Sequence, residues 1–222
     1  MGIGDLMSPK NHYLQRDCPI VLALVTLLVS GPALAETPRP GDPAPAFTMA
    51  TLNPEGCGQP AFSLKRVVGP TAQPARAALV LSFGASYCQP CKAELPELAR
   101  LAAELRDQDV QFVLVVIDTE EEGIAAMSRL AIEELALPFP VLGDRFEILA
   151  RRYGATELPF LALVDGTGRL RWVQRGFAPG SLAALRVELA TLLGPAAAEP
   201  LAPATPKAPG KRRAPRAAKR RR

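Results

Sequence analysis

The chain has 222 residues, of which 48% are hydrophobic, so it can bury one full core and still carry extensions at both ends. Its formal charge of +4 is unevenly distributed, because residues 194–222 carry +8 and residues 36–193 carry −4. The single histidine, His12, precedes this acidic part. The composition therefore excludes a histidine metal ligand, a Cys-His nucleophile and a Ser-His triad from the predicted domain.

An apolar run over residues 20–29 lies near the N-terminus and is followed by Ala33-Leu34-Ala35. Small residues at the two positions that a signal peptidase reads predict a signal peptide over residues 1–35, cleaved before Glu36. The run is shorter than the roughly 20 residues of a transmembrane helix, and an uncleaved anchor is the alternative. Cys18 precedes the run, so we interpret it as removed with the signal. These features predict a periplasmic or otherwise extracytoplasmic protein.

The C-terminal part, residues 194–222, is rich in Pro, Ala, Lys and Arg and lacks aromatic residues. This composition predicts a disordered basic tail. Such a tail is attracted to anionic surfaces, and simple solvation is the plainer interpretation. No specific nucleic-acid partner is expected for an exported protein.

The predicted domain begins with residues 36–45, a proline-rich stretch that cannot hold a helix. Two short strand-like pieces follow, around residues 46–52 and 61–64, and the turn-rich segment between them predicts a hairpin with Cys57 at its tip. We interpret Cys57 as a lone exposed thiol, with an auxiliary thiol or a dimer cross-link as alternatives. Residues 68–75 contain two prolines and are expected to form a loop.

From residue 77 onward the hydrophobic pattern alternates between buried strands and amphipathic helices. The apolar run Phe112–Ile117 is continuous, which suits a strand covered on both faces of a sheet. The glycine-rich turn at residues 165–168 predicts an antiparallel hairpin between the last two strands. The expected elements are strand 78–85, helix 90–106, strand 111–118, a helix capped by Asp118-Thr119 and stopped by Pro138, strand 139–142, helix 145–153, strands 160–164 and 169–174, and helix 181–193.

The tetrapeptide Cys88-Gln89-Pro90-Cys91 lies where the first long strand ends and the following helix begins. Unpaired N–H groups and the positive end of the helix dipole stabilise a thiolate there, so the pKa of the thiol falls below its usual value of about 8.5. Cys88 is nearer the strand and is expected to be the more exposed, attacking sulfur. Cys91 then resolves the mixed disulfide. A permanent disulfide or half of a metal site is the alternative.

Together these features resemble the thioredoxin fold, and more narrowly the extracytoplasmic TlpA-like thiol-disulfide oxidoreductases, which include cytochrome c maturation proteins. The resemblance spans about residues 40–193. It depends on the CxxC with its inner proline, on Glu94-Leu95-Pro96, on residues 139–144, and on Leu158-Pro159 before an apolar strand. It implies an α/β domain over residues 36–193, with a central mixed sheet flanked by helices and an N-terminal β-hairpin extension.

By position, the resemblance implies that Glu94 is an acidic residue beside the active site. If it is buried, its pKa rises and it can relay a proton to or from Cys91; an N-terminal helix glutamate that only favours the dipole is the alternative. The resemblance also implies that Pro159 is a cis-proline that faces the disulfide and presents the backbone of Leu158 to a substrate.

Two positions depart from the family pattern, which usually has tryptophan where this chain has Gly84 and Tyr87. A flatter and less apolar surface around the nucleophile is therefore expected. Tyr87 remains a candidate for contact with the substrate, because it directly precedes Cys88.

The predicted function is a protein disulfide reductase acting through Cys88 and Cys91, of the cytochrome c maturation kind or similar. Its expected partners are protein thiols and disulfides and a membrane electron donor; no cofactor and no metal are expected, and a monomer is predicted. The direction of electron flow rests on the resemblance alone. One alternative is a peroxiredoxin-like thiol peroxidase, although no Thr or Ser stands three residues before Cys88. The other is a non-catalytic module that binds metal or carries electrons, against which the lack of histidine argues.

Overall fold

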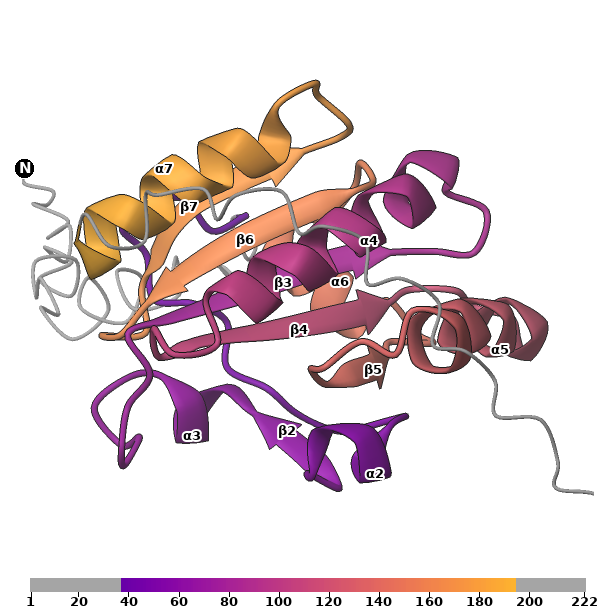
Figure 1. Ribbon diagram of the computed structural model, residues 1–222, viewed down its shortest axis with the longest axis horizontal. Coiled ribbons are helices and arrows are strands. Elements are labelled where there is room, and N and C mark those ends of the chain that lie inside the picture. The colour runs from indigo at the N-terminus through magenta and orange to yellow at the C-terminus, as the bar shows by residue number, and fades with distance from the viewer. Residues whose placement is uncertain (1–36, 195–222) are drawn as a thin grey trace, which may run out of the picture. The chain divides into compact units, whose positions relative to one another are not determined.

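The computed structural model describes residues 37–194, so the expected signal peptide and nearly all of the expected tail lie outside the described residues. The described chain folds into a five-stranded sheet with helices on both faces and a separate two-stranded hairpin (Figure 1). No helix within residues 37–194 is long and apolar enough to cross a bilayer. The expected architecture, a mixed sheet flanked by helices with an N-terminal hairpin, is confirmed.

The strands of the sheet run in two directions. Its members are β3 (Ala78–Gly84), β4 (Val110–Val116), β5 (Val141–Gly143), β6 (Phe160–Asp165) and β7 (Leu170–Arg175). They lie in the order β5-β4-β3-β6-β7; β3, β4 and β5 are parallel, β6 is antiparallel to β3, and β7 is antiparallel to β6. Consequently β3, β4, β5 and β7 all end at one edge of the sheet, the edge to which the arrow of β4 points in Figure 1. The loops after these strands gather at that edge, and the loop that enters β6 reaches it too.

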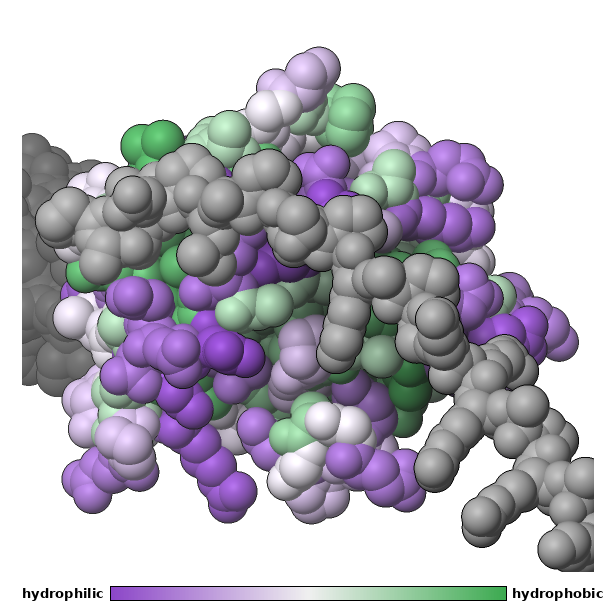
Figure 2. Space-filling model, viewed as in Figure 1, coloured by the Kyte–Doolittle hydropathy of each residue, from purple (hydrophilic) through white to green (hydrophobic). Residues whose placement is uncertain are grey.

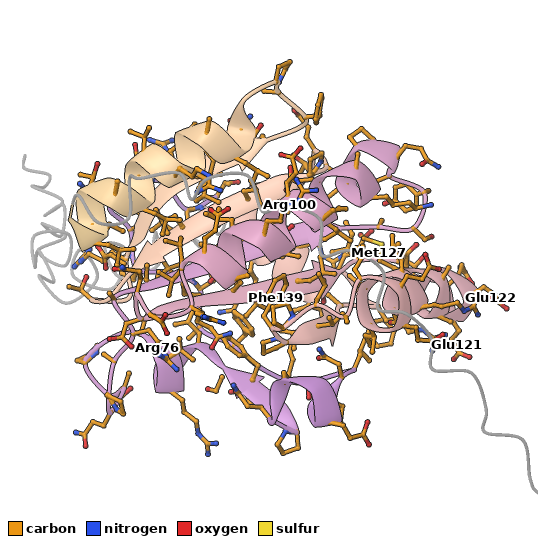
Figure 3. The ribbon with its side chains drawn as sticks, in the orientation of Figure 1. Arg76, Arg100, Glu121, Glu122, Met127 and Phe139 are labelled. Atoms are coloured by element: carbon orange, nitrogen blue, oxygen red, sulfur yellow. A yellow bond between two sulfur atoms is a disulfide. The ribbon has the colours of Figure 1, made fainter. Side chains whose placement is uncertain are left out.

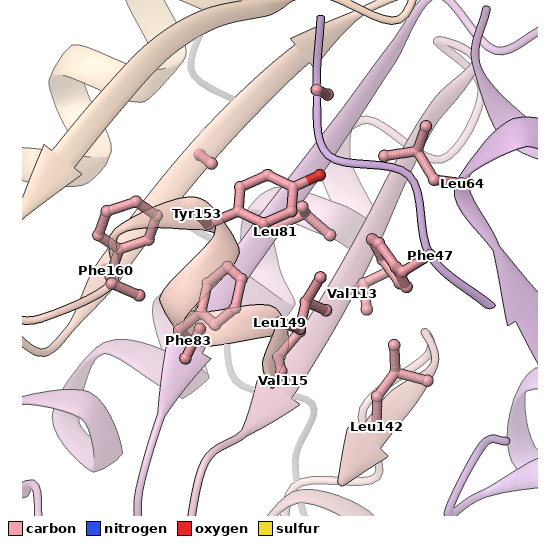
Figure 4. Packing of buried hydrophobic residues seen from close by; sticks show 14 of the residues in the cluster. Phe47, Leu64, Leu81, Phe83, Val113, Val115, Leu142, Leu149, Tyr153 and Phe160 are labelled. Carbon is pink, nitrogen blue, oxygen red and sulfur yellow. The ribbon is translucent and has the colours of Figure 1, made fainter. Parts of the chain in front are cut away.

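One face of the sheet is covered by the hairpin and by α6 (Ile148–Tyr153). Alternate residues of β3 point to this face, where Phe83 packs against Phe160 and Tyr153. The rings of Phe83 and Phe160 meet edge to face with centroids 5.4 Å apart, and those of Phe83 and Tyr153 are 5.6 Å apart (Figure 4). Full burial of each such side chain stabilises the folded state by about 1.5–3 kcal/mol. This cluster therefore fixes the position of β3 and of the start of the loop that follows it.

The opposite face is covered by α4 (Gln89–Glu104) and α7 (Ser181–Leu193), in front of the sheet in Figure 1. Leu95, Leu98 and Leu101 recur at helical spacing on α4 and are buried against the sheet, as the sequence pattern predicted. An ion pair between Arg186 and Glu104 also joins the two helices. The helix that begins at the cysteine pair is therefore fixed along its length.

The hairpin is present, but its tip is more ordered than the expected loop. Its tip forms a helical turn that begins at Pro54, where a missing N–H costs nothing, and ends at Gly58 in the left-handed region (φ 69°). Cys57 is a free thiol, as expected, but it is half-buried instead of exposed, and its Sγ donates a hydrogen bond of 3.5 Å to the carbonyl oxygen of Gln59. The elements here are β1 (Thr48–Ala50), α2 (Pro54–Cys57), β2 (Ala61–Ser63) and α3 (Leu64–Val67).

The expected helix cap at Asp118 is wrong. The helix α5 begins at Glu121, and no side chain caps its first turn. Asp118 is buried and accepts hydrogen bonds from Ser86, because the loop after β3 reaches the end of β4. The helix then widens into a π-helical segment in which Leu135 N–H bonds to the carbonyl oxygen of Leu130. The two segments are α5 (Glu121–Ser128) and η1 (Arg129–Glu134).

Asn53 connects the hairpin to β5 through a buried side chain. Its Nδ2 donates to the carbonyl oxygen of Phe139 and its Oδ1 accepts from Val141 N–H, both at 2.9 Å. Asn53→Ala leaves two buried backbone groups without partners, so we expect the free energy of unfolding to fall by about 2 kcal/mol in urea denaturation.

The matched control for this substitution is Ser63→Ala. Ser63 Oγ accepts only an exposed hydrogen bond from Thr48 Oγ1 (2.9 Å), and its loss should change stability by less than about 0.5 kcal/mol. Equal effects of the two substitutions would contradict the importance of the Asn53 contacts.

Candidate active site

Cys88 and Cys91 form a disulfide where β3 passes into α4, with the two Sγ atoms 2.01 Å apart and the Cα atoms 5.3 Å apart. Cys88 directly precedes the first helical residue, and its Sγ accepts a hydrogen bond from Cys91 N–H at 3.1 Å. Pro90 lies in the first turn, where a missing N–H costs no helical hydrogen bond. Negative charge that develops on Cys88 when the disulfide opens therefore meets an N–H donor and the positive end of the helix.

The two cysteine residues differ in exposure in the expected direction. Cys88 has an exposed fraction of 8% and Cys91 of 3%, so both are largely buried and Cys88 is the more accessible. Tyr87, directly before Cys88, is 69% exposed. The disulfide is therefore more accessible on the side of Cys88 and Tyr87.

Gly84, the last residue of β3, is closely surrounded by neighbouring side chains. A Cβ placed there would lie 3.3 Å from both Cys91 Cβ and Met127 Cε. Met127 is buried on α5, and Figure 3 shows it beside α4. The thioether of Met127 therefore fills the space that a large residue at position 84 would need.

Glu94 lies one turn after Cys91 on α4 and has an exposed fraction of only 7%. Burial, and then the negative charge of Glu97, raise the pKa of Glu94 from 4.5 to about 7. Its side chain borders a cavity of about 350 Å³ that Phe177 and Ser181 also line. Glu94 can therefore gain or lose a proton close to the cysteines near neutral pH.

The Leu158–Pro159 peptide bond is cis, as the family resemblance implies. Pro159 is buried, and Leu158 is half-buried against the apolar clusters on both faces of the sheet. Because Phe160 pairs with Phe83 in the antiparallel ladder, Leu158 and Pro159 lie at the sheet edge where β3 delivers the cysteines. A second cis bond, Gln73–Pro74, lies in the loop before β3 and was not expected.

The contact between Asp118 and Ser86 was not expected from the sequence. Asp118 Oδ2 accepts from Ser86 N–H at 2.8 Å and Asp118 Oδ1 accepts from Ser86 Oγ at 2.6 Å. Gly123 packs over the same carboxylate, since a Cβ there would lie 2.8 Å from Asp118 Cγ. A carboxylate directly after a continuous apolar strand was the available signal. These contacts fix the loop two residues before Cys88.

Within residues 37–194 there is no group of three or more His, Cys, Asp or Glu side chains that could hold a metal ion. The structure instead brings together the cysteine pair, Glu94 and the cis-proline, all at one edge of the sheet. Such an arrangement can form and break disulfides with another chain.

Comparison with protein families matches residues 40–173 to the AhpC/TSA family. The chain is 28% identical over 138 residues to the thiol-disulfide oxidoreductase ResA of Oceanobacillus iheyensis, which covers 62% of this chain and 66% of that protein. It is 31% identical over 125 residues to the thioredoxin-like protein YneN of Bacillus subtilis, which covers 55% of this chain and 72% of that protein. The chain thus spans half to two thirds of the length of the ResA proteins it matches.

Solved structures give the same picture of the fold. A candidate thiol:disulfide interchange protein DsbE from Chlorobium tepidum has a TM-score of 0.59 at 24% identity, over 71% of this chain and 99% of that chain. The structure of MTB DsbF has a TM-score of 0.52 at 25% identity, over 66% of this chain and 94% of that chain. Since the family match covers more than half of the chain and includes both cysteines and Pro159, the chain belongs to the thioredoxin-like AhpC/TSA family.

Proposed function

We propose that this chain is a thiol-disulfide oxidoreductase that exchanges electrons with cysteines of other proteins through Cys88 and Cys91. The observation that carries the proposal is the Cys88–Cys91 disulfide at the N-terminus of α4, with Cys91 N–H bonded to Cys88 Sγ. Relatives named ResA and DsbE, at low identity, support it.

The proposed reaction begins with the reduced pair. The Cys88 thiolate attacks one sulfur of a partner disulfide, a bond forms between Cys88 and that sulfur, and the other partner sulfur leaves as a thiolate. The Cys91 thiolate then attacks Cys88 Sγ, which closes the Cys88–Cys91 bond and releases the second partner thiolate. Two electrons pass to the partner, and a membrane electron donor restores the dithiol. The same steps in reverse would oxidise a partner.

Glu94 is assigned the transfer of the proton that Cys91 must lose before it attacks. Its carboxylate is buried one turn from Cys91, and its pKa of about 7 lets it accept the proton of Cys91 near neutral pH. Glu94 can then release this proton into the adjacent cavity. Tyr87, exposed beside Cys88, and the backbone of Leu158 before the cis-proline are assigned to contact with the partner chain.

We assign the chain to an extracytoplasmic compartment, with residues 1–35 as its signal peptide, residues 36–193 as its domain and residues 194–222 as its tail. N-terminal sequencing of the exported protein should begin at Glu36; an intact N-terminus would favour the anchor.

The proposal is tested by trapping partners with Cys91→Ala in a Cys57→Ala background, which removes the other free thiol of the described domain. The variant lacks the resolving sulfur, so it should accumulate mixed disulfides on Cys88 that are visible on non-reducing gels and vanish with dithiothreitol. The matched control, Cys88→Ala in the same background, should trap none. Trapping by the control and not by Cys91→Ala would reverse the two roles, and failure of both would reject the function.

Electron direction requires a separate measurement. A reductase should equilibrate with glutathione buffers at a potential clearly below the glutathione couple, whereas a potential near or above it indicates an oxidase or isomerase.

The AhpC/TSA match makes a thiol peroxidase the second candidate. Peroxide consumption by the reduced protein, compared with Cys91→Ala, distinguishes that candidate from the disulfide reductase.

A further inference from the structure

Three exposed aromatic side chains surround the disulfide edge of the sheet. Tyr87, Phe146 and Phe177 have exposed fractions of 69%, 70% and 59%. Among the side chains that remain visible in Figure 2, hydrophilic ones predominate and hydrophobic ones form small groups. Single exposed hydrophobic residues need no explanation, but three aromatics at one edge do.

The topology brings these residues to one edge. Tyr87 follows β3, Phe146 follows β5 and Phe177 follows β7, and these three strands end at the same side of the sheet. In the order β5-β4-β3-β6-β7, β3 is central and the other two are the outer strands. With neighbouring strands about 4.8 Å apart, each outer strand lies about 10 Å from β3.

Both phenylalanines stand beside a hollow. Phe146 lines a cavity of about 380 Å³ together with Met49, Ile148 and Leu149, and the cationic groups on it are Arg145 and Arg152. Apolar side chains therefore form most of this hollow. Phe177 lines the cavity of about 350 Å³ that also contains Glu94, Glu97 and Leu182.

A charge effect on Tyr87 and a shared cavity lining relate these two loops to the cysteine pair. Partial burial, and then the charges of Asp118 and Glu147, raise the pKa of Tyr87, so the loop carrying Phe146 and Glu147 lies within electrostatic reach of the residue before Cys88. On the other side, the hollow beside Phe177 contains Glu94, one turn after Cys91. The hollow beside Phe177 therefore adjoins the turn of α4 that follows Cys91, and the loop carrying Phe146 lies near Tyr87.

We propose that Tyr87, Phe146 and Phe177 form a docking surface for an extended segment of an unfolded polypeptide, with its cysteine at Cys88 and apolar side chains two to four residues away on both sides. An extended chain advances about 3.3 Å per residue, so the distance of about 10 Å from the central strand to each outer strand corresponds to about three residues. A folded partner buries apolar side chains next to its cysteines, whereas an unfolded one presents them. This inference depends on the proposed function and names the substrate class.

The surface also revises the expectation of a less apolar site. Position 84 carries no side chain, as expected, but Phe146 and Phe177 supply apolar surface from loops far along the chain. Neither loop belongs to the cysteine motif, so the motif could not reveal them.

The test uses the reduced protein and synthetic peptides whose one cysteine carries 2-nitro-5-thiobenzoate as a mixed disulfide. Cys88 attacks the peptide sulfur and expels the coloured thiolate, which reports the rate; Cys91 then releases the peptide. One peptide has Leu at positions two to four on both sides of the cysteine, a second has Ser there, and a third has its Leu residues more than six positions away. N-acetylcysteinamide carrying the same group gives the reference rate for the dithiol itself.

The Leu-flanked peptide should react roughly tenfold faster than the Ser peptide, and the third peptide should resemble the Ser peptide. Phe146→Ser and Phe177→Ser should each reduce this advantage by roughly threefold or more, with every rate divided by the reference rate of the same variant. Val187→Ser is the matched control, because Val187 is 65% exposed but lies on α7. It should leave the advantage intact.

The outcomes separate the two proposals. Equal rates for the Leu and Ser peptides, or an advantage that survives both phenylalanine substitutions, overturn the docking surface while leaving the reductase intact. If the reference compound itself fails to react, the proposed function fails instead.

Discussion

At pH 8, Glu94→Gln should raise the free energy of unfolding by about 3 kcal/mol more than the same substitution does at pH 4.5. In the folded protein the pKa of Glu94 is raised from 4.5 to about 7 by burial and by Glu97. The folded state therefore binds more protons than the unfolded state between these two values. Stability falls as pH rises through this window and stays at the lower level above it. Glutamine is neutral throughout and removes this loss.

The measurement is urea denaturation of the oxidised protein and of the variant at pH 4.5, 6, 7 and 8. The difference between the two should grow through this range and level off above pH 7. Glu97→Gln removes the smaller of the two causes and leaves the burial of Glu94, so it should lower the pKa of Glu94 and weaken the pH dependence without abolishing it. If the difference in stability between the protein and Glu94→Gln did not depend on pH, Glu94 would ionise in the folded state as it does in the unfolded chain.

Asp118→Ala should destabilise the protein by about 3 kcal/mol and also slow the reaction of Cys88. The substitution removes the acceptor of both hydrogen bonds from Ser86, at 2.8 and 2.6 Å, in a buried site. Hydrogen bonds to a charged group contribute about 1.5–3 kcal/mol each, and part of that loss is recovered when water reaches the loop. Asp118→Asn keeps an acceptor for the Ser86 N–H and should recover most of the stability. Urea denaturation and the rate with a small disulfide measure the two effects.

An independent variant displaces the same carboxylate without removing it. The Cβ of Gly123→Ala would overlap Asp118 Oδ1 and lie 2.9 Å from Asp118 Cβ, so Asp118 must move away from Ser86. It should resemble Asp118→Ala in both measurements. Gly56→Ala is the control, because a Cβ there meets only Asn53 Nδ2, at 3.9 Å. Normal stability of Gly123→Ala would contradict the tight packing around Asp118.

Local patterns were sufficient for most of the elements. The continuous apolar run at Phe112 and the helical spacing of Leu95, Leu98 and Leu101 predicted a strand and a helix that the structure contains, because period and burial are properties of a single segment. The junction of the strand with the cysteine pair also lies within one segment, so the placement of Cys88 at a helix N-terminus was predictable. The cis bond at Pro159 was predictable only from the family resemblance.

Contacts between distant segments followed no local pattern. Asp118 was expected to cap its own helix, and the hydrogen bonds of Ser86, 32 residues earlier, decide its role instead. Phe146 and Phe177 reach the disulfide edge because of the order and direction of β5 and β7, which only the assembled sheet defines. A side chain's partner depends on which segments meet in space. The amino-acid pattern thus specified the cysteine pair and its strand-to-helix setting, while the folded sheet decided what holds that site in place and what surface surrounds it.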